Sequence, residues 1–300
     1  MARFLVSGLL NLEMTAKVRG FPIPYYPIDY PFFGVGTAAS GVALNLSKAL
    51  RTLGDGVILC SMVGDDLPGA MVREELRRAG IASGSVLSSL NETPASVVLY
   101  EDSGRRQIYC DLKDIQEASY GFTPGLLADA DAVLACNINF NRPLLRLAKE
   151  QGKLIATDVH VLADPEDHYN RDFMEAADVL FLSDEGIQGD CHAFLRELAA
   201  RYGCRAIVLG RGAEGASLYV RDGARVTDQP ACRIGGTVNT VGAGDALFAA
   251  FMHFLVKGLD AEQALSKAQL FAAMKIRHSG AANGFPTEEE MNAEEKRCFG

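Results

Sequence analysis

The 300-residue sequence lacks several patterns that would point to common functions. Its seven cysteines form no CxxC pair, and its five histidines show no HxxxH or HExxH spacing, which argues against a structural zinc site. Acidic residues outnumber basic ones, 38 to 29, so the formal net charge is -9. Non-specific nucleic-acid binding needs a basic surface, and we therefore expect no nucleic-acid partner.

Long apolar segments are missing as well. The N-terminal run MARFLVSGLL is interrupted by Asn11 and Glu13, too early for a signal peptide or a membrane span. Together with the scattered, odd-numbered cysteines, this favours reduced thiols in a cytoplasmic protein without a membrane partner. The sequence contains no internal repeat, low-complexity tract or dividing linker, so residues 1–300 are expected to form one domain.

What the sequence does contain is an alternation of short apolar runs with helical patterns. A periodic apolar stretch followed directly by glycine predicts a helix that ends there. Alternation of this kind is typical of a three-layer α/β/α fold around a mostly parallel sheet. The predicted strands are 4–9, 57–63, 132–136, 154–158, 179–182 and 206–209, and the predicted helices include 37–53, 68–79, 142–151 and 191–202.

Two segments break this alternation and are predicted to form a small β-sheet lid on the core. Residues 11–35 carry four prolines and several aromatic residues, so no long helix fits there. Residues 93–115 contain two strand patterns separated by a turn. The aromatic side chains between Tyr25 and Phe33 could stack on a ligand or join two lids in a homodimer, and the homodimer is the favoured interpretation.

One glycine-rich segment, GRGAEG at residues 210–215, matches the dinucleotide-binding pattern GxGxxG. That pattern must follow a strand and open a helix, whereas here strand patterns lie on both sides. Gly210, Gly212 and Gly215 are therefore predicted to form a strand–loop–strand corner. A hydride-transferring enzyme is the weakest functional hypothesis, and a Walker A sequence is absent.

The strongest functional signal is TVGAGD at residues 240–245. Gly242, Ala243 and Gly244 let the backbone approach a ligand, and the apolar run 246–256 predicts a buried helix. Backbone amides at the N-terminus of such a helix form an anion site that suits phosphate. Asp245 lies in the first turn, where it either caps the helix or accepts a proton from an attacking hydroxyl. Its position alone leaves both roles open.

This segment resembles the second signature of the PfkB, or ribokinase-like, carbohydrate kinases. Three further segments resemble that family in order and spacing: residues 40–54 its GGxxxN…LG segment, residues 62–69 its VGDDxxG turn, and residues 209–215 its TLGxxG loop. The resemblance covers about residues 4 to 285. It implies a ribokinase-like fold and an enzyme that transfers the γ-phosphate of ATP, with Mg²⁺ accompanying the nucleotide.

The implied acceptor is a hydroxyl on a small-molecule sugar. Residues 110–115 and 135–139 resemble the branch of the family that phosphorylates nucleosides such as pseudouridine, which leaves a nucleoside as the alternative acceptor. A non-catalytic sugar- or nucleotide-binding protein on the same fold is the alternative of another class.

The resemblance also implies roles for individual residues. Asp245 would be the catalytic base, and the amides of Gly242, Ala243 and Gly244 would form the anion hole. Ala272, Ala273 and Ile276 lie on a predicted helix late in the chain, where they are equally compatible with a purely structural place in the core. The implied acceptor residues are Asn11, Glu13, Gly41 and Asn45, and the implied nucleotide residues are Gly210, Gly212, Gly215, Ala272, Ala273 and Ile276.

The sequence departs from the family pattern at three places. Asn239 replaces the aspartate that opens the family's DTxGAGD run and that belongs to a monovalent-cation site in several relatives, so potassium activation is not carried over. The family's NxxE motif, linked to magnesium, would fall at residues 183–186, where Asp184 or Glu185 is the candidate substitute and no metal ligand is assigned. Ser40 replaces a glycine and would narrow the acceptor pocket.

Overall fold

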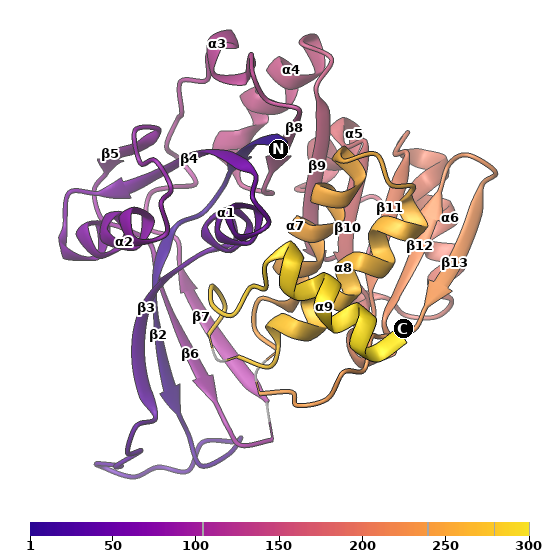
Figure 1. The fold of residues 1–300 in the computed structure, drawn as a ribbon. Coiled ribbons are helices and arrows are strands. Elements are labelled where there is room, and N and C mark those ends of the chain that lie inside the picture. Colours follow the sequence, from indigo (N-terminus) through magenta and orange to yellow (C-terminus); the bar gives the residue numbers. More distant parts are fainter. Residues whose placement is uncertain (104, 239, 279, 300) are drawn as a thin grey trace.

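The centre of the molecule is a large, mostly parallel sheet (Figure 1). The computed structural model describes residues 1–103, 105–238, 240–278 and 280–299. In that part of the chain nine strands form the sheet, in the order β13-β12-β11-β10-β9-β8-β1-β4-β5, and only the pairs that include β12 are antiparallel. These strands are β1 (Arg3–Ser7), β4 (Gly56–Gly64), β5 (Val86–Leu90), β8 (Ala132–Ala135), β9 (Leu154–Val161), β10 (Val179–Ser183), β11 (Ala206–Gly210), β12 (Ala216–Val220) and β13 (Arg225–Gln229).

Helices cover both faces of this sheet, and each face has its own apolar core. In β1, Phe4 and Val6 point into one core and Leu5 into the other, as the two-residue repeat of a strand requires. The predicted α/β/α layers are thereby confirmed. The first core contains side chains of α1 (Val42–Thr52), α2 (Leu67–Arg78), α7 (Ala243–Val256), α8 (Ala261–Lys275) and α9 (Glu288–Phe299), and the second those of α3 (Pro124–Leu127), α4 (Arg142–Glu150), α5 (Arg171–Ala176) and α6 (Cys191–Arg201).

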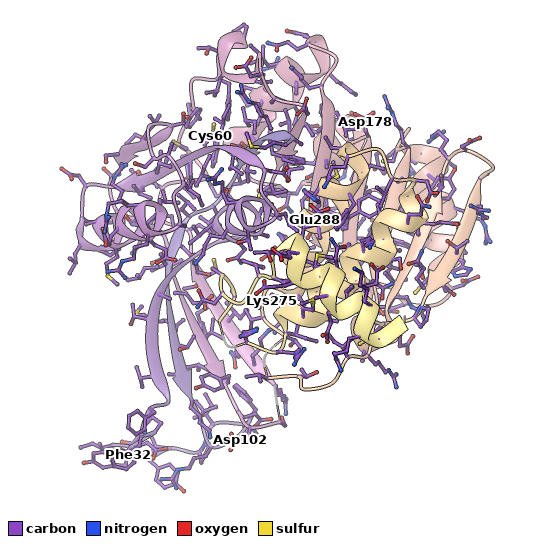
Figure 2. The ribbon with its side chains drawn as sticks, viewed as in Figure 1. Phe32, Cys60, Asp102, Asp178, Lys275 and Glu288 are labelled. Atoms are coloured by element: carbon purple, nitrogen blue, oxygen red, sulfur yellow. The ribbon has the colours of Figure 1, made fainter. Side chains whose placement is uncertain are left out.

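The predicted lid is also confirmed, as a separate four-stranded sheet that extends away from the core (Figure 1). Within it β2 and β6 are parallel, whereas the two outer pairs are antiparallel. At its far end the labelled Phe32 and Asp102 lie well away from the large sheet (Figure 2). The strands, in spatial order, are β3 (Val35–Ser40), β2 (Asn11–Lys17), β6 (Ala95–Tyr100) and β7 (Arg106–Asp111).

One predicted helix, 37–53, is wrong in its first part. Residues 37–40 belong to the lid strand β3, and helix α1 begins only at Val42. The break lies at Gly41, whose φ of 112° is not helical. A Cβ there would lie 2.3 Å from the carbonyl oxygen of Leu9, so only glycine allows the chain to turn from strand into helix at this point.

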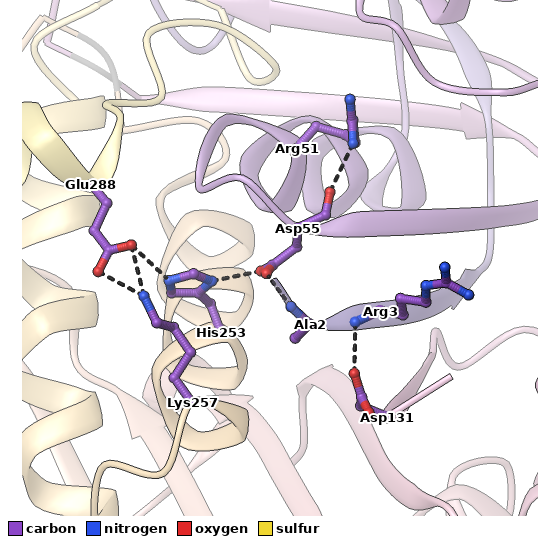
Figure 3. Close-up of polar contacts among 8 residues, drawn as sticks. All are labelled: Ala2, Arg3, Arg51, Asp55, Asp131, His253, Lys257 and Glu288. Carbon is purple, nitrogen blue, oxygen red and sulfur yellow. Dashed lines mark hydrogen bonds and ion pairs between the residues drawn. The ribbon is translucent and has the colours of Figure 1, made fainter. Parts of the chain in front are cut away.

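A buried polar network anchors the C-terminal half of α7 at the N-terminal edge of the sheet (Figure 3). His253 Nδ1 lies 2.6 Å from Asp55 Oδ2, and both side chains are almost wholly buried. The other oxygen of Asp55 accepts the backbone N–H of Ala2 at 3.1 Å. On the opposite side of the ring, Glu288 binds Lys257 at 2.8 Å. None of the helices described is both long and apolar enough to cross a membrane.

We predict that Asp55→Ala destabilises the protein, because His253 and the amide of Ala2 both lose a buried partner. Each unpaired buried polar group costs about 1–3 kcal/mol, so the free energy of unfolding should fall by about 2–6 kcal/mol in denaturant titrations. Asp129→Ala is the matched control, since Asp129 pairs with Arg3 at the surface and exposed pairs contribute at most about 1 kcal/mol. An equal, small effect of both substitutions would contradict the structural role of Asp55.

Candidate active site

The sequence motifs meet at the carboxyl edge of the parallel strands, where ligands bind in open α/β sheets. The chain leaves β8 at Cys136 and approaches the end of β9 at Asp158, and both side chains are close enough to Asp245 to interact with it electrostatically. Asp245 itself comes from the first turn of α7, and Asn45 comes from α1. The structure therefore brings four separate segments to one place.

Asp245 is held by one strong hydrogen bond from Asn45. The Nδ2 of Asn45 donates to Asp245 Oδ2 at 2.6 Å, whereas the cap position of α7 is occupied by Gly242 and has no side-chain cap. Burial raises the pKa of Asp245 to about 6, an effect that the bond from Asn45 and the nearby His160 oppose. The carboxylate is half-buried and ionised at neutral pH, with a proton affinity suited to a general base.

The glycine turn before Asp245 leads directly into α7. Gly242 has a left-handed φ of 76°, and a Cβ on it would lie 2.5 Å from the carbonyl oxygen of Ala281. The N–H of Ala243 donates to the Thr240 carbonyl at 3.1 Å, so this predicted donor is engaged inside the turn. Among the described backbone groups, the first-turn amides without such a partner are those of Gly244 and Asp245.

The predicted acceptor residues Asn11 and Asn45 share an unusual feature. Each amide group uses its nitrogen for a hydrogen bond, Asn11 to Ser96 Oγ at 2.9 Å and Asn45 to Asp245. Each side-chain oxygen is buried and has no hydrogen-bond partner in the part of the chain that the structure describes. An unpaired buried oxygen costs about 1–3 kcal/mol, so both amide groups are only partly satisfied in this structure.

A cavity of about 1080 Å³ lies between the lid and two loops, which contribute residues 237, 238, 240 and 241 and residues 280–283. Glu13 lines it and accepts a hydrogen bond from Ser40 Oγ at 3.3 Å, while burial raises the pKa of its carboxyl. Asn11, Gly41, Asn45 and Asp245 do not line this cavity. Its lining includes Glu13, Thr37, Ser40, Tyr100, Arg106 and Val241.

The predicted strand–loop–strand corner at Gly210 is confirmed, since β11 and β12 are antiparallel and joined by the short 3₁₀ turn Gly212–Glu214. A Cβ on Gly215 would lie 2.1 Å from the carbonyl oxygen of Gln229, so packing requires this glycine. Gln269 of α8 donates to the same carbonyl at 3.2 Å and thereby joins the corner to the late helix.

On that helix, α8, the three predicted nucleotide positions differ in their surroundings. Ala272 packs against the apolar core and Ala273 is buried, as a purely structural role requires. Ile276 follows the last turn, and its carbonyl accepts the N–H of Val238 at 2.9 Å. The structure thus links Ile276 to the segment that leads into the glycine turn.

Sequence reasoning missed two charged features of the site. Asp158 and His160 form a close pair, in which the backbone N–H of His160 donates to Asp158 Oδ1 at 2.8 Å. Burial alone would raise the pKa of Asp158, but the charge and hydrogen bonds of His160 have the larger effect and lower that pKa below its usual value. Lys275 is wholly buried beside the glycine turn. A carboxylate at the end of the predicted strand 154–158 was a usable signal, whereas a lysine in the last turn of a helix is too common to be one.

The segment that departs from the NxxE motif also reaches this edge. Asp184 and Glu185 form a 3₁₀ turn directly after β10, where Asp184 is half-buried and Glu185 is exposed. Asn239 lies outside the described residues. Within the residues described, no group of three or more His, Cys, Asp or Glu side chains is arranged to hold a metal ion.

Comparison with known proteins identifies the family. The model of the pfkB family of carbohydrate kinases matches residues 1–288, so the chain belongs to this family and is a phosphotransferase with an alcohol group as acceptor. An ATP-dependent ribose-1-phosphate kinase from Halopiger xanaduensis is 24% identical over 307 residues, which cover 98% of both chains.

Solved structures show the same fold. A putative ribokinase from Agrobacterium tumefaciens superposes with a TM-score of 0.87 at 23% identity, covering 99% of this chain and 98% of that one. A putative ribokinase II from E. coli, in complex with ATP and Mg²⁺, superposes with a TM-score of 0.80 at 19% identity. The match covers 99% of this chain and 100% of that one.

We predict that Asp245→Asn stabilises the protein at alkaline pH. A carboxyl whose pKa is raised to about 6 favours folding below its unfolded pKa of about 3.9, and this contribution is lost as pH rises through 6. The neutral amide removes the cost of the buried charge, so the free energy of unfolding of the variant should exceed that of the wild type by about 1–3 kcal/mol at pH 8. This difference should shrink as the pH falls from about 6 to about 4.

Asp228→Asn provides a control of opposite sign, because hydrogen bonds from Ser217 and His192 lower the pKa of Asp228. That substitution should lower the denaturant midpoint at pH 8. A loss of stability in both variants would show that burying the charged carboxylate of Asp245 does not destabilise the folded protein.

Proposed function

We propose that the chain transfers the γ-phosphate of ATP to a hydroxyl of a sugar, with Asp245 as base and the first turn of α7 as anion hole. The observation that carries the proposal is the position of Asp245, in the first turn of a helix where the amides of Gly244 and Asp245 have no partner among the described residues, with its carboxylate held by Asn45 at 2.6 Å. A base and an anion site on one turn are the two elements that phosphoryl transfer requires.

The step follows from this geometry. Asp245 would take the proton from the acceptor hydroxyl as its oxygen attacks the γ-phosphorus, and the bond to the β-phosphate oxygen would break on the opposite side. The negative charge that develops on the phosphoryl oxygens would be compensated by the amides of Gly244 and Asp245 and by the positive end of the helix dipole. A general base positioned in this way increases the reaction rate by about 10²–10⁴-fold.

On the acceptor side, we propose that Asn11, Glu13, Gly41 and Asn45 bind the sugar. The unpaired oxygens of Asn11 and Asn45 would accept sugar hydroxyl protons, and the carboxylate of Glu13 would accept two hydroxyls at once. A Cβ on Gly41 would lie 2.3 Å from the carbonyl oxygen of Leu9, so this position has to be glycine and would offer the sugar only its backbone. A sugar is favoured over a nucleoside because the relative from Halopiger xanaduensis is named as a ribose-1-phosphate kinase.

On the nucleotide side, ATP would lie along Gly210, Gly212 and Gly215 toward the loop after Ile276. Mg²⁺ in such enzymes is held mostly by phosphates and water, which fits the lack of a preformed carboxylate cluster among the described residues. Asp184 or Glu185, in the 3₁₀ turn after β10, would contact its water shell. When bound, the ion supplies charge compensation to the phosphates.

The tip of the lid supports a homodimer. Tyr25, Ile28, Tyr30, Phe32 and Phe33 are all exposed there, which is unusual for large apolar side chains on a single lid. We propose that two lids pack tip to tip, and sedimentation equilibrium of the full chain would test it. The unpaired thiols are compatible with the cytoplasm as the compartment.

An ADP-release screen tests the proposed reaction. Full-length protein with Mg-ATP would be offered pentoses, hexoses, sugar phosphates, sugar acids and nucleosides, and we expect turnover with a sugar. Asp245→Asn should then lose about 10²–10⁴-fold in kcat, the usual contribution of a general base. Asp129→Asn, at an exposed surface carboxylate, is the control and should keep the wild-type rate.

Two results would contradict the proposal. One is an Asp245→Asn variant as active as the control. The other is a wild-type protein that binds ATP and a sugar yet phosphorylates nothing in the screen.

A further inference from the structure

Lys275 has an unusual environment for a charged side chain. It lies in the last turn of α8 and has no exposed surface, although lysine is rarely buried without an acidic partner. Its ammonium donates to the backbone carbonyl of Val241 and, at 3.0 Å, to that of Gly280. In the described part of the chain it forms no salt bridge. Its charge is therefore balanced by carbonyl dipoles and, at longer range, by Asp245.

The two carbonyls belong to the two loops that build the anion turn. Val241 directly precedes Gly242, and Gly280 directly precedes Ala281, whose carbonyl oxygen would lie 2.5 Å from a Cβ on Gly242. The two loops thus touch backbone to backbone, and the ammonium of Lys275 joins the carbonyls on either side of the contact. The structure gives α7 no side-chain cap at Gly242, and this bridge is one of the contacts that hold the turn from outside the helix.

The same geometry bears on the monovalent cation that several members of the family use. Backbone carbonyls from irregular loops are suitable ligands for such an ion. Here, however, the carbonyls of Val241 and Gly280 are already engaged by a fixed positive charge. A second cation at these oxygens would be repelled by the ammonium at short range. The residues present therefore do not fit a potassium or sodium ion bound to these two oxygens.

We propose that Lys275 acts as a tethered monovalent cation, a positioning residue that holds the anion turn so that activity needs no added potassium or sodium. The inference rests on the proposed phosphoryl transfer, because holding the turn in place affects the rate only if the turn binds the transferring phosphate. Burial lowers the pKa of Lys275 to about 8 and Asp245 opposes this, so the side chain still carries its charge at neutral pH.

Lys275→Met tests the proposal, because it removes the charge while keeping an unbranched side chain that can stay buried. The matched control is Lys267→Met, on the same helix, where Lys267 pairs with Glu295 near the surface. We expect Lys275→Met to lose about 10²–10³-fold in kcat, as when one oxyanion donor is lost, with little change in the KM for the acceptor. The control should match the wild type in both constants.

Cation dependence separates this role from a merely structural one. Wild-type kcat should be the same in potassium chloride and in tetramethylammonium chloride of equal ionic strength. Lys275→Ala, which leaves a space at the two carbonyls, should be partly rescued by potassium or methylammonium. A wild type that requires potassium, or a Lys275→Met variant with wild-type kcat, would overturn the proposal.

Hydrogen exchange provides a readout that does not need an acceptor. Peptides covering residues 240–246 should exchange faster in Lys275→Met than in the wild type or in Lys267→Met. If the wild type phosphorylates no acceptor, the proposed function fails, and the exchange data still decide whether Lys275 holds the turn. Unchanged exchange in Lys275→Met would refute that role.

Discussion

The burial of α7 is the constraint on which the site depends. Phe248 and Phe251 of this helix have no exposed surface and pack against Phe181 of the sheet, with ring centroids 4.5 and 5.4 Å away. At the far end, His253 is fixed to Asp55. A helix held along its length and at its C-terminal half keeps its N-terminal end at a fixed place in the fold, and Lys275 holds the turn that leads into it. The apolar helix therefore determines where its N-terminal amides and Asp245 meet a ligand.

Placing a charged group at the end of a buried helix has an electrostatic consequence. Burial shifts Asp245 and Lys275 in opposite directions, raising the pKa of the carboxyl to about 6 and lowering that of the ammonium to about 8. Both groups stay ionised near pH 7, although each is closer to neutrality than in water. The site thus keeps a carboxylate that can accept a proton, and the positive charge of Lys275 at longer range lowers the cost of burying that carboxylate.

Much of the fold followed from local signals in the sequence. The buried parallel strands are continuous apolar runs, and the helices before Gly80, Gly152 and Gly203 end where those glycines predict. The polar edge strands β5 and β13 carry no such apolar run and were not predicted. The first part of the predicted helix 37–53 failed because pairing with β2 outweighs helical propensity, and that pairing comes from a distant segment.

The site could be predicted less completely. The motif residues Asp245 and Asn45 meet as the family pattern implies, 200 positions apart in sequence. Other features depend on contacts that no local pattern encodes. The engagement of the Ala243 amide by Thr240 and the bridge from Lys275 to two carbonyls arise only when two loops pack against each other. Asp158 reaches the site because β9 ends at the same edge of the sheet as β1 and β4.

The most direct test of the role of Asp245 is a titration of its carboxyl group in the ligand-free, full-length protein. Difference infrared spectra between the wild type and Asp245→Asn isolate the carboxyl band of this residue as pH changes. A base desolvated by α7 and held by Asn45 should titrate with a midpoint near 6. A midpoint at the ordinary value of 3.8 would show a solvated carboxylate and would contradict its assignment as the tuned base of the site.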